Sequence, residues 1–223
     1  MSARHASSGV GTVLFDLDGT LADTAPDLGY VLNLQRLARG LEEMPLEQLR
    51  PVVSQGARGL LRVGFGLTPG QDGYESMRDE FLELYARNLV RHTRLFEGVA
   101  ELLDTLDRKG LAWGVVTNKL ARFTDPLLEL LGLAQRAGCV ISGDTCARAK
   151  PHPDPLLEAA RRLGVAAAGC TYIGDDERDM QAGRAAGMRA VVALYGYLGE
   201  NPAPGNWEAD GSIEQPLDLL HLL

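Results

Sequence analysis

Cysteine is scarce in this chain of 223 residues, which has only three, at positions 139, 146 and 170, and no Cys-x-x-Cys pair. Thiols so few and so widely spaced provide neither a disulfide framework nor a zinc site, and reduced thiols are usual in cytoplasmic proteins. No apolar run approaches the length of about 20 residues that a membrane-spanning helix needs. The opening segment, MSARHASSGVG, is polar and lacks the apolar stretch of a signal peptide. We therefore expect a cytoplasmic protein that does not bind membranes.

Positive charge is also in short supply. The chain has 22 Lys and Arg residues against 30 Asp and Glu residues, a formal net charge of -8. This balance disfavours a general affinity for nucleic acid, although a local group of cations or a metal ion can still bind a small anionic substrate. The sequence contains neither G-x-x-x-x-G-K-[ST] nor a strand–GxGxxG–helix unit, so a nucleotide-binding α/β protein is a weak alternative. The oligomeric state does not follow from the sequence.

Short apolar runs closed by small or polar residues predict buried parallel strands. Four of them lie at 12–15, 112–117, 170–174 and 189–194, and CVISG at 139–143 is a weaker fifth. Leucine-rich segments with helical spacing, each ended by glycine, separate these runs. Alternating strands and helices are typical of a doubly wound parallel sheet, so we predict an α/β fold with a Rossmann-like core.

One region breaks this alternation, because residues 25–92 have helical periodicity and no convincing strand. We predict that residues 23–94 form an all-helical cap domain above the carboxyl edge of the sheet. The cap would be inserted into an α/β core domain made of residues 1–22 and 95–223. A Gly- and Pro-rich segment at 196–206 is expected to be an irregular surface loop.

Polar and charged side chains follow the predicted strands, at the edge where open α/β sheets bind their ligands. Asp16 and Asp18 end the first strand, and their side chains point to the same side because they are two residues apart. Two such carboxylates repel each other unless a cation or a shared proton relieves them. Other candidates at this edge are Thr117, Asn118, Lys119, Lys150, Asp175, Asp176 and Asp179. Together these residues suit a site for a cation and an oxyanion.

Four segments in this order resemble the motifs of the haloacid dehalogenase-like hydrolase superfamily. They are DLDGT at 16–20, VVTNK at 115–119, AKPHPDP at 149–155 and YIGDDERD at 172–179. The helical insertion between the first two segments matches the position of the superfamily's cap, and the resemblance covers nearly the whole chain.

The resemblance implies a phosphate-transfer site that depends on Mg²⁺. Asp16 would be the nucleophile that attacks phosphorus and forms an aspartyl-phosphate, which water then hydrolyses. Asp16, Asp175 and the backbone carbonyl of Asp18 would hold the ion, which makes the closeness of the carboxylates tolerable. The side chain of Asp18 would protonate the leaving oxygen and later deprotonate water.

The remaining motif residues would bind the phosphoryl group or support the ion. Thr117 and the backbone of Asn118 would bind phosphoryl oxygens, and Lys150 would neutralise charge between nucleophile and phosphate. Asp176 and Asp179 would orient Lys150 and the water ligands of the ion.

These residues also have structural interpretations. The first acidic pair could form a turn after a strand, and Thr117 could cap a helix. Lys150 could be a solvated surface lysine, Asp175 and Asp176 could cap the helix that follows, and a structural role for Asp179 is as well supported as ligation. The presence of four motifs in order favours the functional interpretation.

An aspartate at position 18 narrows the reaction that the resemblance implies. Dehalogenases of the superfamily lack an acid at this position, and its transport ATPases have threonine there, so Asp18 favours a phosphatase or a phosphomutase. Mutases of the β-phosphoglucomutase kind carry a His-Arg pair early in the cap. The cap here opens with ADTAPDLGYVL, and the absence of His from this opening segment favours hydrolysis to inorganic phosphate.

The cap is expected to select the substrate. Arg58, in SQGARGLL at 54–61, resembles the substrate-recognition element of the phosphoglycolate phosphatase group. Arginine can bind a carboxylate with two hydrogen bonds, as 2-phosphoglycolate requires, but a surface arginine that stabilises a helix end is an equal alternative. Lys119 adds positive charge and is a second candidate for substrate binding.

Two further interpretations stay open at this point. The segments YGYLGENP and NWEADGSIEQPLDLL also resemble bacterial N-acetylmuramic acid 6-phosphate phosphatases. Their substrate also carries a carboxylate, so Arg58 does not discriminate between the two candidate substrates. We place phosphoglycolate first and N-acetylmuramic acid 6-phosphate second. A catalytically silent, metal-binding regulatory domain is the alternative of a different class, which predicts a gap in the motif set, and none is visible.

Overall fold

The computed structural model describes residues 11–200 and 203–223. The polar opening segment, for which we predicted no signal peptide, lies outside the described residues apart from Gly11. Residues 201–202 of the predicted 196–206 loop lie outside them as well. Among the helices that the structure describes, none is both long enough and apolar enough to cross a bilayer.

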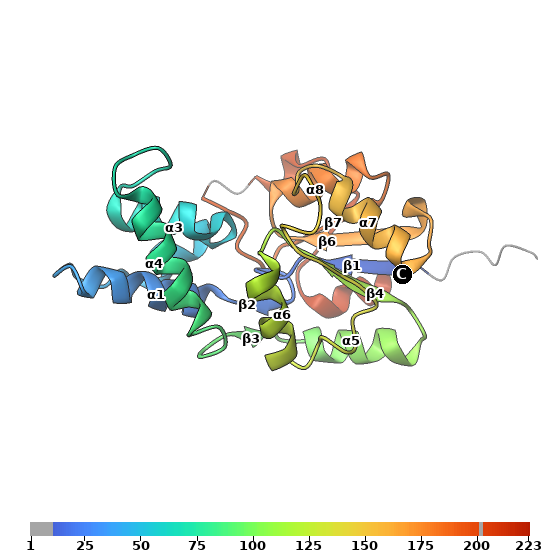
Figure 1. The fold of residues 1–223 in the computed structure, drawn as a ribbon. Coiled ribbons are helices and arrows are strands. Elements are labelled where there is room, and N and C mark those ends of the chain that lie inside the picture. The colour runs from blue at the N-terminus through green and yellow to red at the C-terminus, as the bar shows by residue number, and fades with distance from the viewer. Residues whose placement is uncertain (1–10, 201–202) are drawn as a thin grey trace, which may run out of the picture.

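A six-stranded parallel sheet forms the centre of the molecule (Figure 1). Its strands are β1 (Thr12–Phe15), β4 (Trp113–Val116), β5 (Val140–Ile141), β6 (Cys170–Gly174), β7 (Arg189–Ala193) and β8 (Gly211–Ile213). They are arranged in the order β5-β4-β1-β6-β7-β8, and every pair of neighbours is parallel. The five predicted strands are all present. Strand β8 escaped prediction because three residues at the edge of a sheet carry no periodic pattern.

Helices cover both faces of this sheet. One face packs against α5 (Val99–Arg108), α6 (Ala121–Leu130) and the 3₁₀ helix η4 (Pro216–His221). The other packs against α7 (Asp154–Leu163) and α8 (Glu177–Ala185), with the short turns η2 (Ala167–Gly169) and η3 (Pro204–Asn206) in the connections. Burial on both faces explains why the strands are apolar throughout rather than alternating. The predicted doubly wound α/β fold is therefore confirmed.

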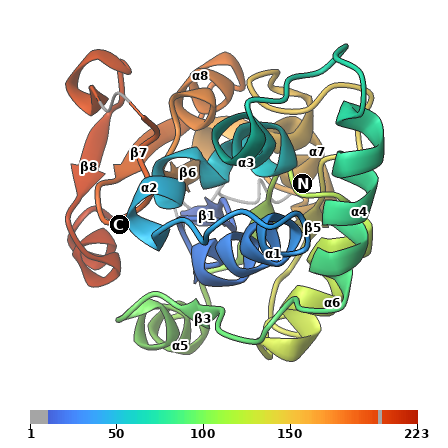
Figure 2. The ribbon, with the colours of Figure 1, turned by 90° about the vertical axis from the view of Figure 1, so that its left-hand side faces the viewer.

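The helical segment between β1 and β4 forms a second apolar cluster at the carboxyl edge of the sheet (Figures 1 and 2). Its elements are α1 (Ala25–Leu37), α2 (Leu46–Leu49), η1 (Arg50–Gln55), α3 (Gly56–Phe65) and α4 (Tyr74–Ala86). Met77, Phe81 and Tyr85 lie one turn apart on α4 and are buried in this cluster. Because these helices bury their own apolar faces against one another, they have a core separate from that of the sheet.

Two very short strands join the helical segment to the sheet. They are β2 (Ala22–Asp23) and β3 (Arg94–Leu95), and they pair antiparallel. The chain thus leaves and re-enters the α/β part at one place. On this basis we propose residues 23–94 as the cap domain, and we call the β2–β3 ribbon with the start of α1 the hinge.

Candidate active site

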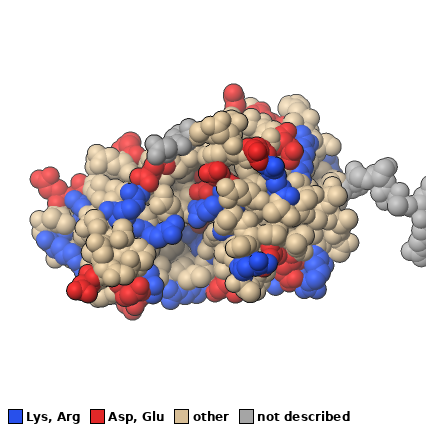
Figure 3. All heavy atoms as spheres, turned by 90° about the horizontal axis from the view of Figure 1, so that it is seen from above, with Lys and Arg blue, Asp and Glu red and all other residues tan. Residues whose placement is uncertain are grey.

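A pocket of about 390 Å³ lies between the carboxyl edge of the sheet and the cap. The space-filling view shows a hollow there in which basic and acidic side chains face each other (Figure 3). Nine of the ten residues predicted for the site line this pocket: Asp16, Asp18, Arg58, Thr117, Asn118, Lys119, Lys150, Asp176 and Asp179. The tenth, Asp175, is fully buried beside Asp16.

Three carboxylates from two separate segments converge. One oxygen atom each of Asp16, Asp175 and Asp179 lies within 4.8 Å of the others. Asp16 follows β1, and the other two follow β6, which is its neighbour in the sheet. Thr20 Oγ1 donates to Asp175 Oδ1 at 3.0 Å, and the backbone N–H of Tyr197 donates to Oδ2 at 2.8 Å. Asp16 and Asp175 are thus close enough to share one ion.

The turn that brings Asp16 and Asp175 together requires a glycine. Gly19 has a φ of 83°, a conformation that L side chains rarely adopt. A Cβ atom at this position would lie 2.1 Å from Asp175 Oδ2. Any other residue at 19 would therefore strain the turn and displace the Asp175 carboxylate.

The carboxylate cluster is poorly suited to carry its charge without a cation. Burial raises the pKa of Asp16 to about 7, an effect that Lys150 opposes and the charge of Asp179 reinforces. Burial also raises the pKa of Asp175 well above its usual value, and the charges of Asp16 and Asp179 add to this. A divalent cation favours the ionised forms and so lowers these pKa values. Carboxylate oxygens are preferred ligands of Mg²⁺, and the donor set therefore fits this ion.

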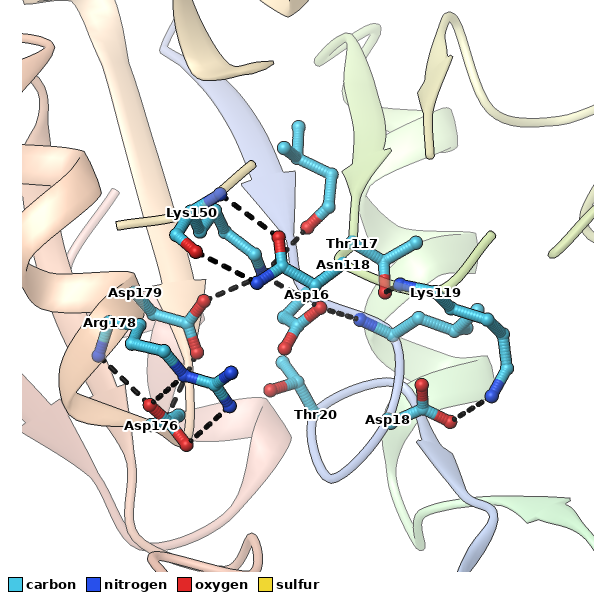
Figure 4. A network of polar contacts seen from close by, with 12 residues as sticks. Asp16, Asp18, Thr20, Thr117, Asn118, Lys119, Lys150, Asp176, Arg178 and Asp179 are labelled. Atoms are coloured by element: carbon cyan, nitrogen blue, oxygen red, sulfur yellow. Dashed lines mark hydrogen bonds and ion pairs between the residues drawn. The ribbon is translucent and has the colours of Figure 1, made fainter. Parts of the chain in front are cut away.

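Lys150 is fixed beside the same carboxylates (Figure 4). Its Nζ lies 2.9 Å from Asp16 Oδ1 and 2.7 Å from Asp179 Oδ1. It also donates to the hydroxyl of Tyr172 at 2.7 Å and to the carbonyl of Val116 at 3.1 Å. Burial acts against its charge, but Asp16 and Asp179 outweigh burial and raise the pKa of Lys150. Lys150 is thus a buried cation and not a solvated surface lysine.

The side chain of Asn118 holds the backbone of Lys150. Asn118 Nδ2 donates to the carbonyl of Lys150 at 2.9 Å, and the N–H of Lys150 donates to Asn118 Oδ1 at 3.0 Å. Thr117 is buried at the end of β4, where its hydroxyl accepts the N–H of Lys119 at 3.2 Å. The sequence pointed only to the backbone of Asn118, and it gave no sign of Tyr172, because a tyrosine in a buried strand has no local signal of such a contact.

Asp18 points away from the carboxylate cluster. Its Oδ1 accepts hydrogen bonds from Thr24 Oγ1 at 2.5 Å and from Lys119 Nζ at 2.9 Å. The ammonium of Lys119 also lies 4.8 Å from the ring centroid of Tyr85, which comes from the cap. Burial acts against the charge of Lys119, but Asp18 and Tyr85 together outweigh burial and raise the pKa of Lys119. Asp18 is therefore held by a cation of its own.

Arg178 links the core to the cap. Its Nε and Nη2 donate to the two carboxylate oxygens of Asp176, each at 2.8 Å, and Nη2 also donates to the carbonyl of Ser54 in η1 at 2.8 Å. Asp176 accepts the N–H of Arg178 as well and caps α8, while Asp179 Oδ2 accepts the N–H of Asp176 at 3.1 Å. The capping interpretation of Asp176 is thus present in the structure. Arg178 was not among the predicted site residues.

Known proteins similar to this chain show which family it belongs to. The model of the family described as haloacid dehalogenase-like hydrolase matches residues 13–193. The chain belongs to the haloacid dehalogenase-like hydrolase family. The N-acetylmuramic acid 6-phosphate phosphatase of Pseudomonas putida is 44% identical over 93% of both chains. The phosphoglycolate phosphatase of Xanthomonas campestris is 48% identical over 93% of both chains. These relatives identify the chain as a phosphoric monoester hydrolase.

A solved structure shares the whole architecture. The crystal structure of a predicted phosphoglycolate phosphatase from Haemophilus somnus has a TM-score of 0.84 to this chain at 26% identity. The match covers 95% of this chain and 97% of that chain. The sheet and the helical segment above it are therefore arranged alike in the two proteins.

The cap side of the pocket differs in character from the core side. Arg58 in α3 is exposed, lines the pocket and has no ion-pair partner within residues 11–200 and 203–223. Apolar and aromatic side chains of the cap form a wall of the same pocket, namely Leu28, Val53, Phe81, Leu82 and Tyr85, and Leu120 and Phe123 of the core extend it. The Ser54 Oγ and the Tyr85 hydroxyl are buried and have no hydrogen-bond partner among the described residues. The hydrolase thus offers charged groups on the core side of the pocket and a mainly apolar surface with one exposed arginine on the cap side.

Proposed function

We propose that this haloacid dehalogenase-like hydrolase is a Mg²⁺-dependent phosphomonoesterase in which Asp16 is transiently phosphorylated. The observation that carries the proposal is the position of Asp16, which lies within 4.8 Å of two other carboxylates and 2.9 Å from the ammonium of Lys150. When bound, Mg²⁺ supplies positive charge that offsets the repulsion between a carboxylate and a phosphoryl group. Asp16, Asp175 and the backbone carbonyl of Asp18 would hold it, with Asp179 close by.

The side chains of this site can carry both halves of the reaction. An oxygen of Asp16 forms a bond to phosphorus as the ester P–O bond breaks, and Asp18 in its protonated form gives a proton to the leaving oxygen. Asp18 then takes a proton from the water that attacks phosphorus, and the bond between phosphorus and Asp16 breaks. The hydrogen bonds from Thr24 and Lys119 both end on Oδ1 of Asp18, which leaves Oδ2 for the substrate.

The phosphoryl oxygens would be bound on the core side of the pocket. The Thr117 hydroxyl and the Asn118 backbone N–H lie at the end of β4 and would donate to them. Lys150 would neutralise the charge of the phosphoryl group as this group approaches Asp16. The ammonium of Lys150 already lies beside Asp16 before substrate binds. Asp179 keeps this ammonium in place at 2.7 Å. Asp176 would act indirectly, because it caps the start of α8 and accepts a hydrogen bond from Arg178.

The cap side of the pocket suits a phosphomonoester that also carries a carboxylate. Arg58 has no ion-pair partner in the part of the chain that the structure describes, so its guanidinium can bind this group, and Lys119 adds a second cation to the pocket. The sequence placed phosphoglycolate first, but a pocket of about 390 Å³ falls in the range of sites for larger ligands. The apolar wall suits the body of an amino sugar. These features favour N-acetylmuramic acid 6-phosphate over the two-carbon acid.

A phosphate-release assay tests the function and the substrate together. The purified chain is incubated with phosphoglycolate, N-acetylmuramic acid 6-phosphate, hexose phosphates, nucleotides and p-nitrophenyl phosphate, with Mg²⁺ and with a chelator. We expect Mg²⁺-dependent release, with the highest kcat/KM on the muramic acid ester. A well-folded chain that releases no phosphate from any ester would support the regulatory-domain alternative instead. The cytoplasmic location stays a prediction of the sequence.

A further inference from the structure

The first helix of the cap domain, α1, lacks the N-capping hydrogen bond that its sequence predicts. Thr24 is the N-cap residue of α1, and a threonine there normally accepts a backbone N–H of the first turn through its hydroxyl. In this chain the Thr24 side chain makes no such bond. Its hydroxyl instead donates to Asp18 Oδ1 at 2.5 Å. The backbone N–H groups at the start of α1 therefore need another acceptor.

Tyr197 supplies that acceptor from the loop after β7. Its hydroxyl accepts the N–H of Thr24 at 2.8 Å and the N–H of Ala25 at 2.9 Å, and it lies 3.0 Å from Asp23 Oδ1, to which it donates. The side chain is nearly buried, at 5% exposure. One hydroxyl of the core thus binds three consecutive residues of the hinge.

The backbone of the same residue binds the carboxylate cluster. The N–H of Tyr197 donates to Asp175 Oδ2 at 2.8 Å. The preceding Gly196 permits this approach, because a Cβ atom there would lie 2.2 Å from Asp175 Cβ and 2.4 Å from the carbonyl oxygen of Gly19. The loop is therefore packed against Asp175 with no room for a side chain between them.

The cap contributes a further contact to this group. Arg50 of η1 donates to both carboxylate oxygens of Asp23, each at 2.9 Å, and its guanidinium carbon lies 5.6 Å from the ring centroid of Tyr197. Asp23 thus receives hydrogen bonds from the cap and from the core at once. A rotation of the cap about the hinge would have to break or carry along the Tyr197 contacts.

We propose that Tyr197 is a positioning residue that couples the hinge of the cap to the metal-binding carboxylate Asp175. Its hydroxyl fixes the start of α1, and its backbone N–H fixes Asp175, so the position of the cap and the orientation of this carboxylate are set by one side chain and its loop. The inference rests on the proposed function, in which Asp175 binds Mg²⁺. It assigns a role to the 196–200 part of the loop that the sequence left as irregular surface.

The variant Tyr197→Phe tests the coupling because it removes the hydroxyl and keeps both the ring and the backbone N–H. Tyr195→Phe is the matched control: its hydroxyl is in the same loop but donates to the carbonyl of Thr20 at 3.0 Å and not to the hinge. The measurements are amide hydrogen exchange at Thr24 and Ala25 and calorimetric titration with Mg²⁺. We expect Tyr197→Phe to raise hinge exchange about fivefold or more and to weaken Mg²⁺ binding about threefold or more, as the loss of buried hydrogen bonds predicts.

The control variant should leave exchange at the hinge unchanged. If exchange at Thr24 and Ala25 in Tyr197→Phe equals that of the wild type, the Tyr197 hydroxyl does not fix the start of α1. If exchange is faster but the Mg²⁺ affinity is unchanged, the hinge and Asp175 are not coupled. If Tyr197→Phe does not fold, Arg50→Gln loosens the same group from the cap side and is expected to change both quantities in the same direction. Neither measurement needs turnover, so a chain that releases no phosphate would contradict the proposed function and leave the role of Tyr197 to be judged separately.

Discussion

Lys119 and Asp18 form a buried ion pair, with 2.9 Å between Nζ and Oδ1 and side chains that are 7% and 17% exposed. Asp16, only two residues earlier, is paired with Lys150 at the same distance. The two neighbouring carboxylates therefore each have a separate lysine, which relieves the repulsion between them in addition to any bound ion. This division also separates their roles, since Asp16 faces the carboxylate cluster and Asp18 faces the cap.

Lys119→Met should lower both activity and stability. Loss of the ammonium leaves the carboxylate of Asp18 partly buried without its cation, a change that typically costs about 3 kcal/mol of unfolding free energy. We expect kcat on p-nitrophenyl phosphate to fall about tenfold or more, because Asp18 loses the group that orients it. Lys109→Met is the matched control, since Lys109 is exposed and lies outside the pocket. Equal effects of the two variants in steady-state assays and urea melts would argue against a role for the ion pair.

Asp16→Asn should abolish turnover and leave the fold intact. The amide is nearly the same size as the carboxyl group but cannot attack phosphorus, so we expect a loss of at least about 10³-fold in kcat. Its melting temperature should not fall, because the substitution removes one charge from a buried cluster of like charges. Mass spectrometry of quenched reactions should show no phosphorylated protein. Detectable phosphorylation of this variant would mean that another residue is the nucleophile.

Much of the fold and most of the candidate site were predictable because their signals are local. Strands β1, β4 and β6 are buried on both faces and read as short apolar runs, and the side chains that follow them meet at one edge whatever the details of packing. In the structure the predicted side chains that follow these strands, among them Asp16 and Asp179, lie together at one pocket.

The contacts that position these groups were not predictable. Tyr197 and Thr24 lie 173 positions apart, and no local pattern distinguishes a tyrosine that caps a distant helix from one that only packs. Arg178 reads as a surface residue at a helix start, yet it reaches Ser54 across the pocket. Such contacts depend on how the cap sits on the core, which is a property of the three-dimensional arrangement and not of any short segment.

Arg58→Ala should damage the hydrolysis of carboxylated substrates more than that of p-nitrophenyl phosphate. Loss of a charge-assisted contact to the carboxylate predicts a decrease of about 10- to 100-fold in kcat/KM for phosphoglycolate and N-acetylmuramic acid 6-phosphate. The ester without a carboxylate should lose much less. Arg87→Ala, at an exposed position just after α4, serves as the control. A uniform loss on all three esters would remove Arg58 from substrate recognition.

The stability of the metal-free chain should fall as the pH rises from about 4 to about 7. Burial raises the pKa of Asp16 from its ordinary value of 3.8 to about 7, and the pKa of Asp175 moves in the same direction. In this window the folded state binds more protons than the unfolded state, so unfolding becomes easier as protons are withdrawn. Mg²⁺ binds the ionised carboxylates and should restore the lost stability, most strongly near pH 8.

Thermal melts at pH 5, 6.5 and 8, with Mg²⁺ and with a chelator, check this expectation. The melting temperature with the chelator should drop toward pH 8, and the gap between the two series should widen with pH. Asp16→Asn removes one of the two titrating groups and should flatten the series recorded with the chelator. A gap that does not change with pH would show that the charges of these carboxylates do not govern the binding of the ion.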